Sequence, residues 1–75
     1  MTTTDFIEKL SDTFEKETIQ IHLDDAFKEY DEWDSLALLS LMATLEEEYS
    51  VTIPRTEFEK IKTVQNLFDY VKSHQ

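Results

Sequence analysis

The sequence predicts an all-α fold, a small four-helix bundle with a long first connection and a short third helix. The chain of 75 residues has no glycine and one proline, so the residues that punctuate strands and hairpins are missing. Apolar residues recur at helical spacing in several segments. Hydrophobic residues make up 40% of the chain, which disfavours disorder. A chain of this length is expected to form one domain, residues 1–75.

The first helix is expected from Thr4 to Glu17. Thr3 or Thr4 can cap its N-terminus, because a threonine hydroxyl accepts a hydrogen bond from an unpaired backbone N–H group. Four apolar residues at helical spacing form its core stripe. These are Phe6, Ile7, Leu10 and Phe14.

A long connection follows, from Thr18 to Trp33. Connections of this length without structure of their own are uncommon and tend to be functional. Several apolar side chains are expected to pin this one onto the core. They are Ile19, Ile21, Leu23, Phe27 and Trp33.

The second helix is expected to run from Asp34 or Ser35 to about Tyr49. Helical spacing places its core face on Leu38, Leu41, Met42, Leu45 and Tyr49. The opposite side carries Ala37, Ser40, Thr44, Glu47 and Glu48. Leu36 and Ala43 lie on a flank and form a small exposed apolar strip, a plausible partner contact. Leu39 shares that flank and fits the core or the exposed strip equally well.

Ser50 to Arg55 is a connector in which Val51 and Ile53 point inward. Pro54 blocks helix continuation, and a short third helix begins at Thr56, with Thr56 and Glu59 in a capping-box pattern. Phe58 and Ile61 are its apolar residues. Thr63 can cap the last helix, whose stripe is Val64, Leu67, Phe68 and Val71.

The charge balance excludes several function classes. Seventeen acidic and seven basic residues give a net charge of -10, which disfavours nucleic-acid binding and contact with anionic membranes. An acidic surface suits basic protein partners, although it can also serve solubility alone. No apolar run is long enough to span a bilayer, no secretory signal is visible, and cysteine is absent. We expect a cytoplasmic monomer.

The most informative residues are Asp34, Ser35 and Leu36, at the N-terminus of the second helix. If Asp34 is the cap, the Ser35 hydroxyl lies beside unpaired N–H groups and the positive end of the helix dipole. That environment favours an attached phosphate diester. Asp34 would then serve a modifying enzyme, for instance by offering a carboxylate to its metal. Alone, the tripeptide is more often an ordinary helix cap.

Catalysis by the chain itself is not expected. A serine without a positioned base is a poor nucleophile, and no Ser-His-Asp or Cys-His set can be assembled, so we assign no catalytic residue. His22 and His74 lie far apart in the sequence and are interpreted as surface residues. The pairs Asp24-Asp25 and Asp31-Glu32 lack the glycine of a calcium loop, and no metal site is expected.

Further motifs accompany the tripeptide in a fixed order. They are Leu45-Glu46-Glu47-Glu48-Tyr49, Ile53-Pro54 and Thr63-Val64-Gln65-Asn66-Leu67-Phe68-Asp69-Tyr70-Val71. With Asp34-Ser35-Leu36, they make the sequence resemble the acyl carrier proteins over essentially its whole length. The resemblance implies a four-helix bundle with 4'-phosphopantetheine transferred from coenzyme A to Ser35 by a phosphopantetheinyl transferase. The thiol of this group would hold acyl groups as thioesters.

The same resemblance implies a set of partner contacts and a cargo cleft. Enzymes that load and transfer acyl groups, through basic docking patches, would contact Leu36, Leu39, Ser40, Ala43, Glu46 and Glu47 on the second helix. A cleft between the second and third helices would shelter the acyl chain. Its expected lining is Met42, Leu45, Ile53 and Ile61.

Two departures from the fatty-acid-synthesis members point to a specialised pathway. Those members commonly have acids where this chain has Ala37 and Ser40, and often a small residue where it has Trp33. The Trp-Asp-Ser-Leu form is similar to free-standing carriers of dedicated acyl or aminoacyl transfer systems. The alternative is an acidic interaction or inhibitor protein that binds a basic partner without covalent modification.

Overall fold

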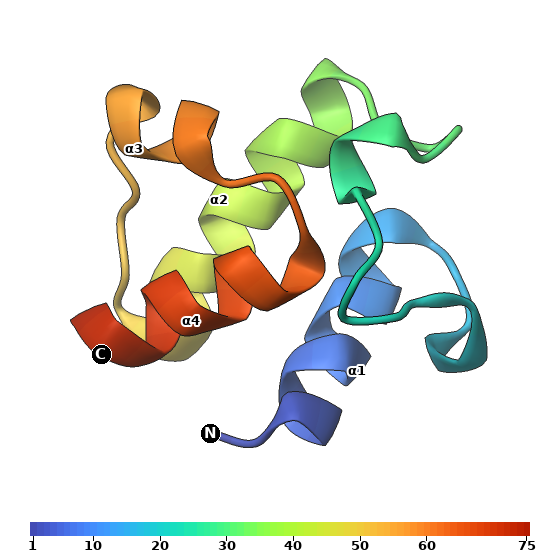
Figure 1. The fold of residues 1–75 in the computed structure, drawn as a ribbon, viewed down its shortest axis with the longest axis horizontal. Helices are drawn as coiled ribbons and strands as arrows, with labels where there is room; N and C mark the ends of the chain where they lie inside the picture. The colour runs from blue at the N-terminus through green and yellow to red at the C-terminus, as the bar shows by residue number, and fades with distance from the viewer.

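The computed structural model describes residues 1–75, and its regular secondary structure is entirely helical, with no strand (Figure 1). The helices are α1 (Thr3–Phe14), α2 (Ser35–Tyr49), α3 (Arg55–Lys60) and α4 (Val64–His74). The connection from α1 to α2 contains two short 3-10 turns, η1 (Thr18–Gln20) and η2 (Phe27–Glu29). The predicted four-helix fold is therefore confirmed, including its short third helix.

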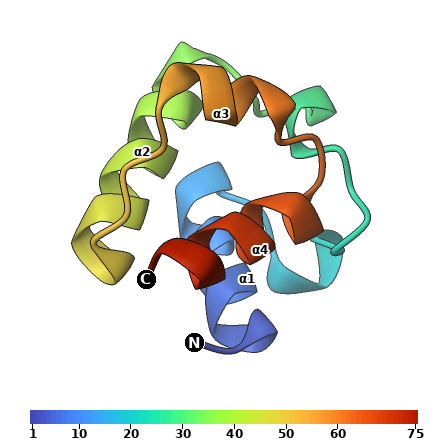
Figure 2. The ribbon, with the colours of Figure 1, turned by 60° about the vertical axis from the view of Figure 1, so that its left-hand side comes forward.

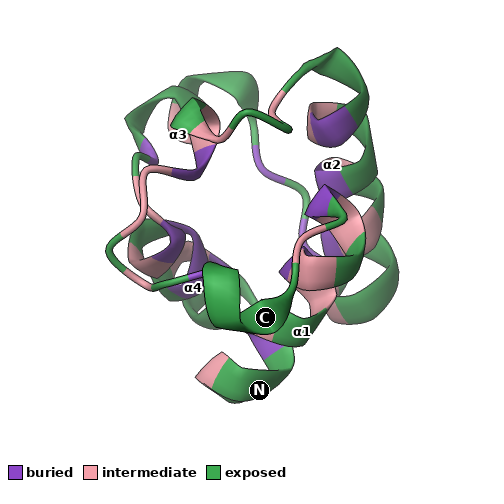
Figure 3. Ribbon diagram, turned by 90° about the vertical axis from the view of Figure 1, so that its right-hand side faces the viewer, coloured by how far each residue is buried: buried purple, intermediate pink, exposed green.

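One hydrophobic cluster holds the helices together. All 15 buried residues are hydrophobic, and Figure 3 shows them on the inward sides of the ribbons. Figure 2 shows α3 crossing the end of the bundle where α2 begins. The ring of Phe58 on α3 stacks there on Trp33, with centroids 6.2 Å apart. The two chain ends lie at the opposite end of the bundle in both views.

Helix α1 begins and ends earlier than predicted. Its cap is Thr2, whose side chain accepts a hydrogen bond from the N–H of Asp5 at 3.1 Å; the prediction of Thr3 or Thr4 was wrong. The helix ends because Glu15 adopts a left-handed conformation, with φ of 55°, and its N–H bonds to the Ser11 carbonyl. The predicted stripe is buried except for Ile7, which packs half-buried against the core.

The connection between α1 and α2 is attached to the start of α4 by backbone hydrogen bonds. The Val64 N–H donates to the Asp25 carbonyl at 3.0 Å, and the Gln65 N–H donates to the Leu23 carbonyl at 2.8 Å. Ile21 and Phe27 are buried, and Leu23 and Trp33 are half-buried. The prediction for Ile19 was wrong, because it is 77% exposed.

Helix α2 has the predicted bounds but a different buried side. Ala37, Leu41 and Leu45 are its buried residues, whereas the expected core residues Leu38, Met42 and Tyr49 are half-buried. Ala37 was predicted on the solvent side and is only 8% exposed. Thr44, also predicted there, is half-buried, and its hydroxyl lies 3.1 Å from that of Thr13 on α1. The small side chains of Ala37 and Thr44 let α1 pack closely, which turns this side inward.

The C-terminal half follows the predictions except at the start of α3. That helix begins at Arg55 after Pro54, with no side-chain cap, so the predicted capping box of Thr56 and Glu59 does not form. Val51, Ile53 and Ile61 are buried. Thr63 caps α4, accepting from the Asn66 N–H at 3.1 Å, and the whole predicted stripe of α4 is buried.

Candidate functional site

The start of α2 presents Ser35 to solvent. Asp34 is the N-cap, and its Oδ1 accepts a hydrogen bond from the Ala37 N–H at 2.8 Å. The Asp34 carbonyl accepts from the Leu38 N–H at 3.0 Å. The backbone N–H groups of Ser35 and Leu36 donate to no acceptor in the protein. Two free donors therefore surround the first residue of the helix, at the positive end of its dipole.

The Ser35 hydroxyl has no hydrogen-bond partner and lies on an exposed residue. Neither histidine is hydrogen-bonded to Ser35. His22 Nδ1 lies 3.7 Å from Asp25, and His74 Nδ1 lies 2.8 Å from the Tyr70 carbonyl. The hydroxyl is therefore accessible, and no side chain of the protein is hydrogen-bonded to it as a general base would be.

One side of α2 forms a continuous exposed strip that begins beside Ser35. We call it the α2 strip, and it consists of Leu36, Leu39, Ser40, Ala43, Glu46 and Glu47. Leu36 is 72% exposed and Leu39 is 65% exposed, so Leu39 belongs to the surface. Glu46 and Glu47 form no ion pair within the protein, unlike Glu48, which pairs with Lys9 at 3.3 Å. The strip therefore combines apolar contacts with two free carboxylates.

A groove of about 430 Å³ lies between α2 and α3, with Ile53 of the segment before α3 also in its lining. It is lined by Leu38, Leu39, Met42, Ile53, Arg55 and Phe58. Of the residues expected in a cleft here, Met42 and Ile53 line the groove, while Leu45 and Ile61 are buried in the core. The expected lining did not include Leu38, Leu39, Arg55 or Phe58, which also line the groove. Leu38 and Phe58 belong to the same apolar patterns as Met42 and Ile61, which were expected there.

The far wall of the groove is held in place by contacts from the long connection. Lys28 Nζ donates to the Phe58 carbonyl at 2.8 Å and lies 4.2 Å from the centre of the Phe58 ring. Burial, together with the charge of Lys62, lowers the pKa of Lys28. Trp33 stacks on the same ring. These contacts hold Phe58 at the wall of the groove.

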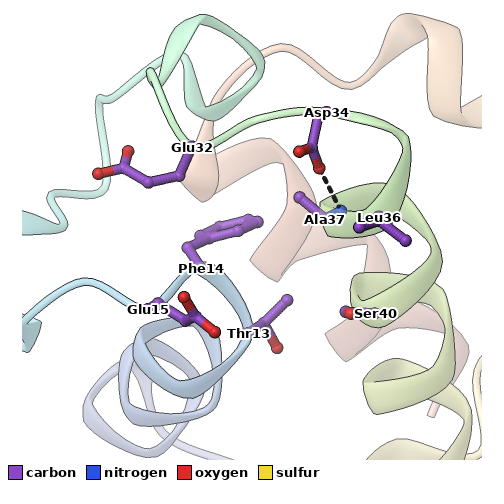
Figure 4. A pocket seen from close by; sticks show the side chains of 8 residues that line it. All are labelled: Thr13, Phe14, Glu15, Glu32, Asp34, Leu36, Ala37 and Ser40. Atoms are coloured by element: carbon purple, nitrogen blue, oxygen red, sulfur yellow. Dashed lines mark hydrogen bonds between the residues drawn. The ribbon is translucent and has the colours of Figure 1, made fainter.

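A second cavity, of about 330 Å³, lies on the α1 side of the same helix start. Figure 4 shows its lining: Thr13, Phe14, Glu15, Glu32, Asp34, Leu36, Ala37 and Ser40. The dashed line in that view is the capping bond from Ala37 to Asp34. Glu32 pairs with Lys16 at 3.3 Å. Glu15 and Asp34 give the neighbourhood of Ser35 a negative charge that α2 itself lacks in its first turn.

Asp25, in the long connection, makes its contacts within that loop. Asp25 Oδ2 accepts hydrogen bonds from the Tyr30 hydroxyl at 2.6 Å and from the His22 N–H at 2.9 Å. Partial burial by itself would raise the pKa of Asp25, but these two hydrogen bonds and the His22 charge lower it below its ordinary value. No three histidine, cysteine or carboxylate side chains lie close enough together to hold a metal ion. None of the helices combines the length and the apolar character required to cross a bilayer.

Comparison with known protein families gives a match over most of the chain. The family model described as "Phosphopantetheine attachment site" matches residues 3–71. The match covers all four helices except the last residues of α4, and it includes the exposed serine at the start of α2. Proteins of that family carry a 4'-phosphopantetheine prosthetic group.

Proposed function

The chain belongs to the phosphopantetheine attachment site family, and from this premise we propose that it tethers acyl or aminoacyl groups through an arm on Ser35. The family match makes it a carrier domain rather than a catalytic one. When bound, the phosphopantetheine arm supplies a terminal thiol that holds cargo as a thioester. The chain's own residues position the arm and present it to enzymes that act on the cargo.

The observation that carries the assignment to Ser35 is its exposed, unpartnered hydroxyl beside two free backbone N–H groups. Helix N-termini bind phosphate because their N–H groups point outward and the dipole favours negative charge. A phosphodiester on Ser35 would therefore find donors already in place. No side chain has to move to accommodate it, since the hydroxyl bonds to nothing.

Asp34 supports the attachment step in a different way. Its Oδ1 caps α2, and no hydrogen bond within the protein engages its Oδ2. That oxygen is free to contact a metal ion in the transferase, where the cation would neutralise the phosphates of coenzyme A. Asp34 thus assists a partner while it also fixes the helix start.

Recognition is proposed to run through the α2 strip. Leu36, Leu39 and Ala43 offer apolar contact, and Glu46 and Glu47 offer unpaired charges to basic patches on a transferase and on acyl-loading or acyl-transfer enzymes. Charges of this kind mainly steer association. With a net charge of -10, nucleic acid is a poor partner.

The pathway is proposed to be specialised rather than bulk fatty-acid synthesis. Ala37 is buried and Ser40 is an uncharged surface residue, and the first turn of α2 carries no acid. A partner that expects acids at those two positions would dock less well. Rescue of cells that lack their main fatty-acid carrier would contradict this specialisation.

The direct test is intact mass after incubation with coenzyme A and a broad-specificity phosphopantetheinyl transferase. We expect one phosphopantetheine adduct on the wild type and none on Ser35→Ala. Ser73→Ala is the matched control, because it removes an exposed hydroxyl from α4, outside the α2 strip, and should leave the adduct intact. If the wild type stays unmodified while a known carrier is modified in the same tube, the chain is better explained as an acidic binding protein.

A further inference from the structure

We propose that Arg55 makes the groove between α2 and α3 selective for acyl cargo that ends in a carboxylate. The inference rests on the proposed carrier function and narrows it, since that function leaves the cargo open between acyl and aminoacyl groups. Arg55 would act as a specificity-determining residue that contacts the distal end of the cargo.

The groove lies within easy reach of the attachment residue. Leu38 and Leu39 line it, and they follow Ser35 by three and four positions on the same helix. One helical turn rises only about 5.4 Å, so the near edge of the groove is adjacent to the point where the arm would be attached. Cargo carried on that arm can therefore reach this apolar surface.

The lining suits a chain of methylene groups with one anionic end. Five of the six lining residues are hydrophobic, and burying methylene groups there is favourable in proportion to the area removed from water. Arg55 is the single charged residue of the groove. A guanidinium presents paired N–H donors that match the two oxygens of a carboxylate.

No strong interaction within the protein explains why residue 55 is an arginine. Its side chain is 94% exposed, and its one ion-pair contact, from Nε to Glu59 Oε1, is 3.8 Å long. Two exposed side chains at that distance stabilise a fold very little. Arg55 is also the first residue of α3, where a positive charge opposes the helix dipole. The arginine at position 55 therefore does not favour helix α3, but it places a positive charge at the edge of the groove.

Neighbouring cations are committed elsewhere. Lys28 bonds to the Phe58 carbonyl, and Lys60 pairs with Glu57 at 3.3 Å. In a protein with a net charge of -10, an anionic cargo would be repelled from most of the surface. Arg55 is the available exception beside the groove, and an ammonium-terminated cargo would be repelled there.

The experiment loads the arm with matched cargoes. The transferase is supplied with adipoyl, hexanoyl or amine-terminated hexanoyl coenzyme A, and the cleavage of each protein-bound thioester by hydroxylamine is timed against the same thioester on free pantetheine. We expect adipoyl to be protected roughly threefold more than hexanoyl, the scale of one exposed charge contact. The amine-terminated chain should be protected least. A shift of the Arg55 Nε resonance on adipoyl loading is the second readout.

Variants separate this contact from general electrostatics. Arg55→Met should abolish the difference between adipoyl and hexanoyl, and Arg55→Glu should reverse it. Lys62→Met removes an equal charge from an exposed residue outside the groove and should preserve the difference. Equal protection of both cargoes by the wild type, or equal loss in Arg55→Met and Lys62→Met, would overturn the proposal. Failure to form any adduct would instead count against the carrier function itself.

Discussion

The carboxylate of Asp34 accepts a hydrogen bond from the backbone N–H of Ala37 at 2.8 Å. This bond sets the first residue of α2, because it satisfies one of the donors that a helix N-terminus leaves unpaired. Ser35 follows directly, with its hydroxyl unpartnered and its N–H free. The residue that caps the helix and the residue proposed to carry the arm are thus adjacent, and their roles can be separated by substitution.

Asp34→Asn should keep the fold and impair modification. An amide oxygen caps as well as a carboxylate, so the free energy of unfolding should change by only a few tenths of a kcal/mol. Asp34→Ala should lose about 1 kcal/mol. Both variants should be modified more slowly by the transferase. Full modification rates in Asp34→Asn would show that the carboxylate charge has no part in the transfer.

Charge reversal on the α2 strip should weaken recognition without unfolding the protein. In Glu46→Lys with Glu47→Lys, we expect the modification rate at low salt to fall roughly tenfold, because steering by exposed charges acts on association. The control is Glu8→Lys with Asp12→Lys on α1, two exposed residues that change the net charge equally. Equal slowing in both double variants would mean that the strip is not the docking surface.

Glycine should stabilise the end of α2. Ser50 adopts φ of 56° and closes the helix with its N–H on the Glu46 carbonyl, a left-handed conformation that glycine tolerates best. Ser50→Gly should raise the free energy of unfolding by about 0.5 kcal/mol. Ser40→Gly, in the middle of the same helix, should lower it by a similar amount. Chemical denaturation of both variants measures the contrast.

Removal of the Tyr49 hydroxyl should not destabilise the protein. This oxygen is buried and has no hydrogen-bond partner, while the ring packs 5.9 Å from Phe6. A buried polar atom without a partner carries a desolvation cost of about 1 kcal/mol or more. Tyr49→Phe should therefore unfold at the same or a higher denaturant concentration. A clear loss of stability would indicate a hydrogen bond to an ordered water.

The Tyr30–Asp25 contact should give a pH-dependent contribution to stability. The pKa of Asp25 is lowered in the folded state despite its partial burial, so the stabilisation is present above the ordinary carboxyl pKa of 3.8 and is lost as the pH falls through the lower folded value. Tyr30→Phe removes one of the bonds that lower it. The stability difference between wild type and Tyr30→Phe should therefore narrow in acid. A constant difference would contradict this linkage.

Helix starts could be predicted from the sequence where the cap is a local hydrogen bond. Asp34 and Thr63 each accept from an N–H three residues along the chain, and both were identified from residue type alone. The same reasoning failed at α3, where the helix begins one residue earlier than predicted, Pro54 is the N-cap and no capping box forms at Thr56. At α1 it chose a neighbouring threonine, since Thr2, Thr3 and Thr4 are chemically equivalent as caps.

Local chemistry was thus enough to place Ser35 at the exposed start of a helix, because capping and the helix dipole act within a single turn. The buried side of α2 and the walls of the groove depended on packing between distant segments. Ala37 is buried because α1 lies against it, and Phe58 lines the groove because Lys28 and Trp33 hold it there. Such contacts join residues far apart in the chain, and helical periodicity carries no information about which neighbour a given face will meet.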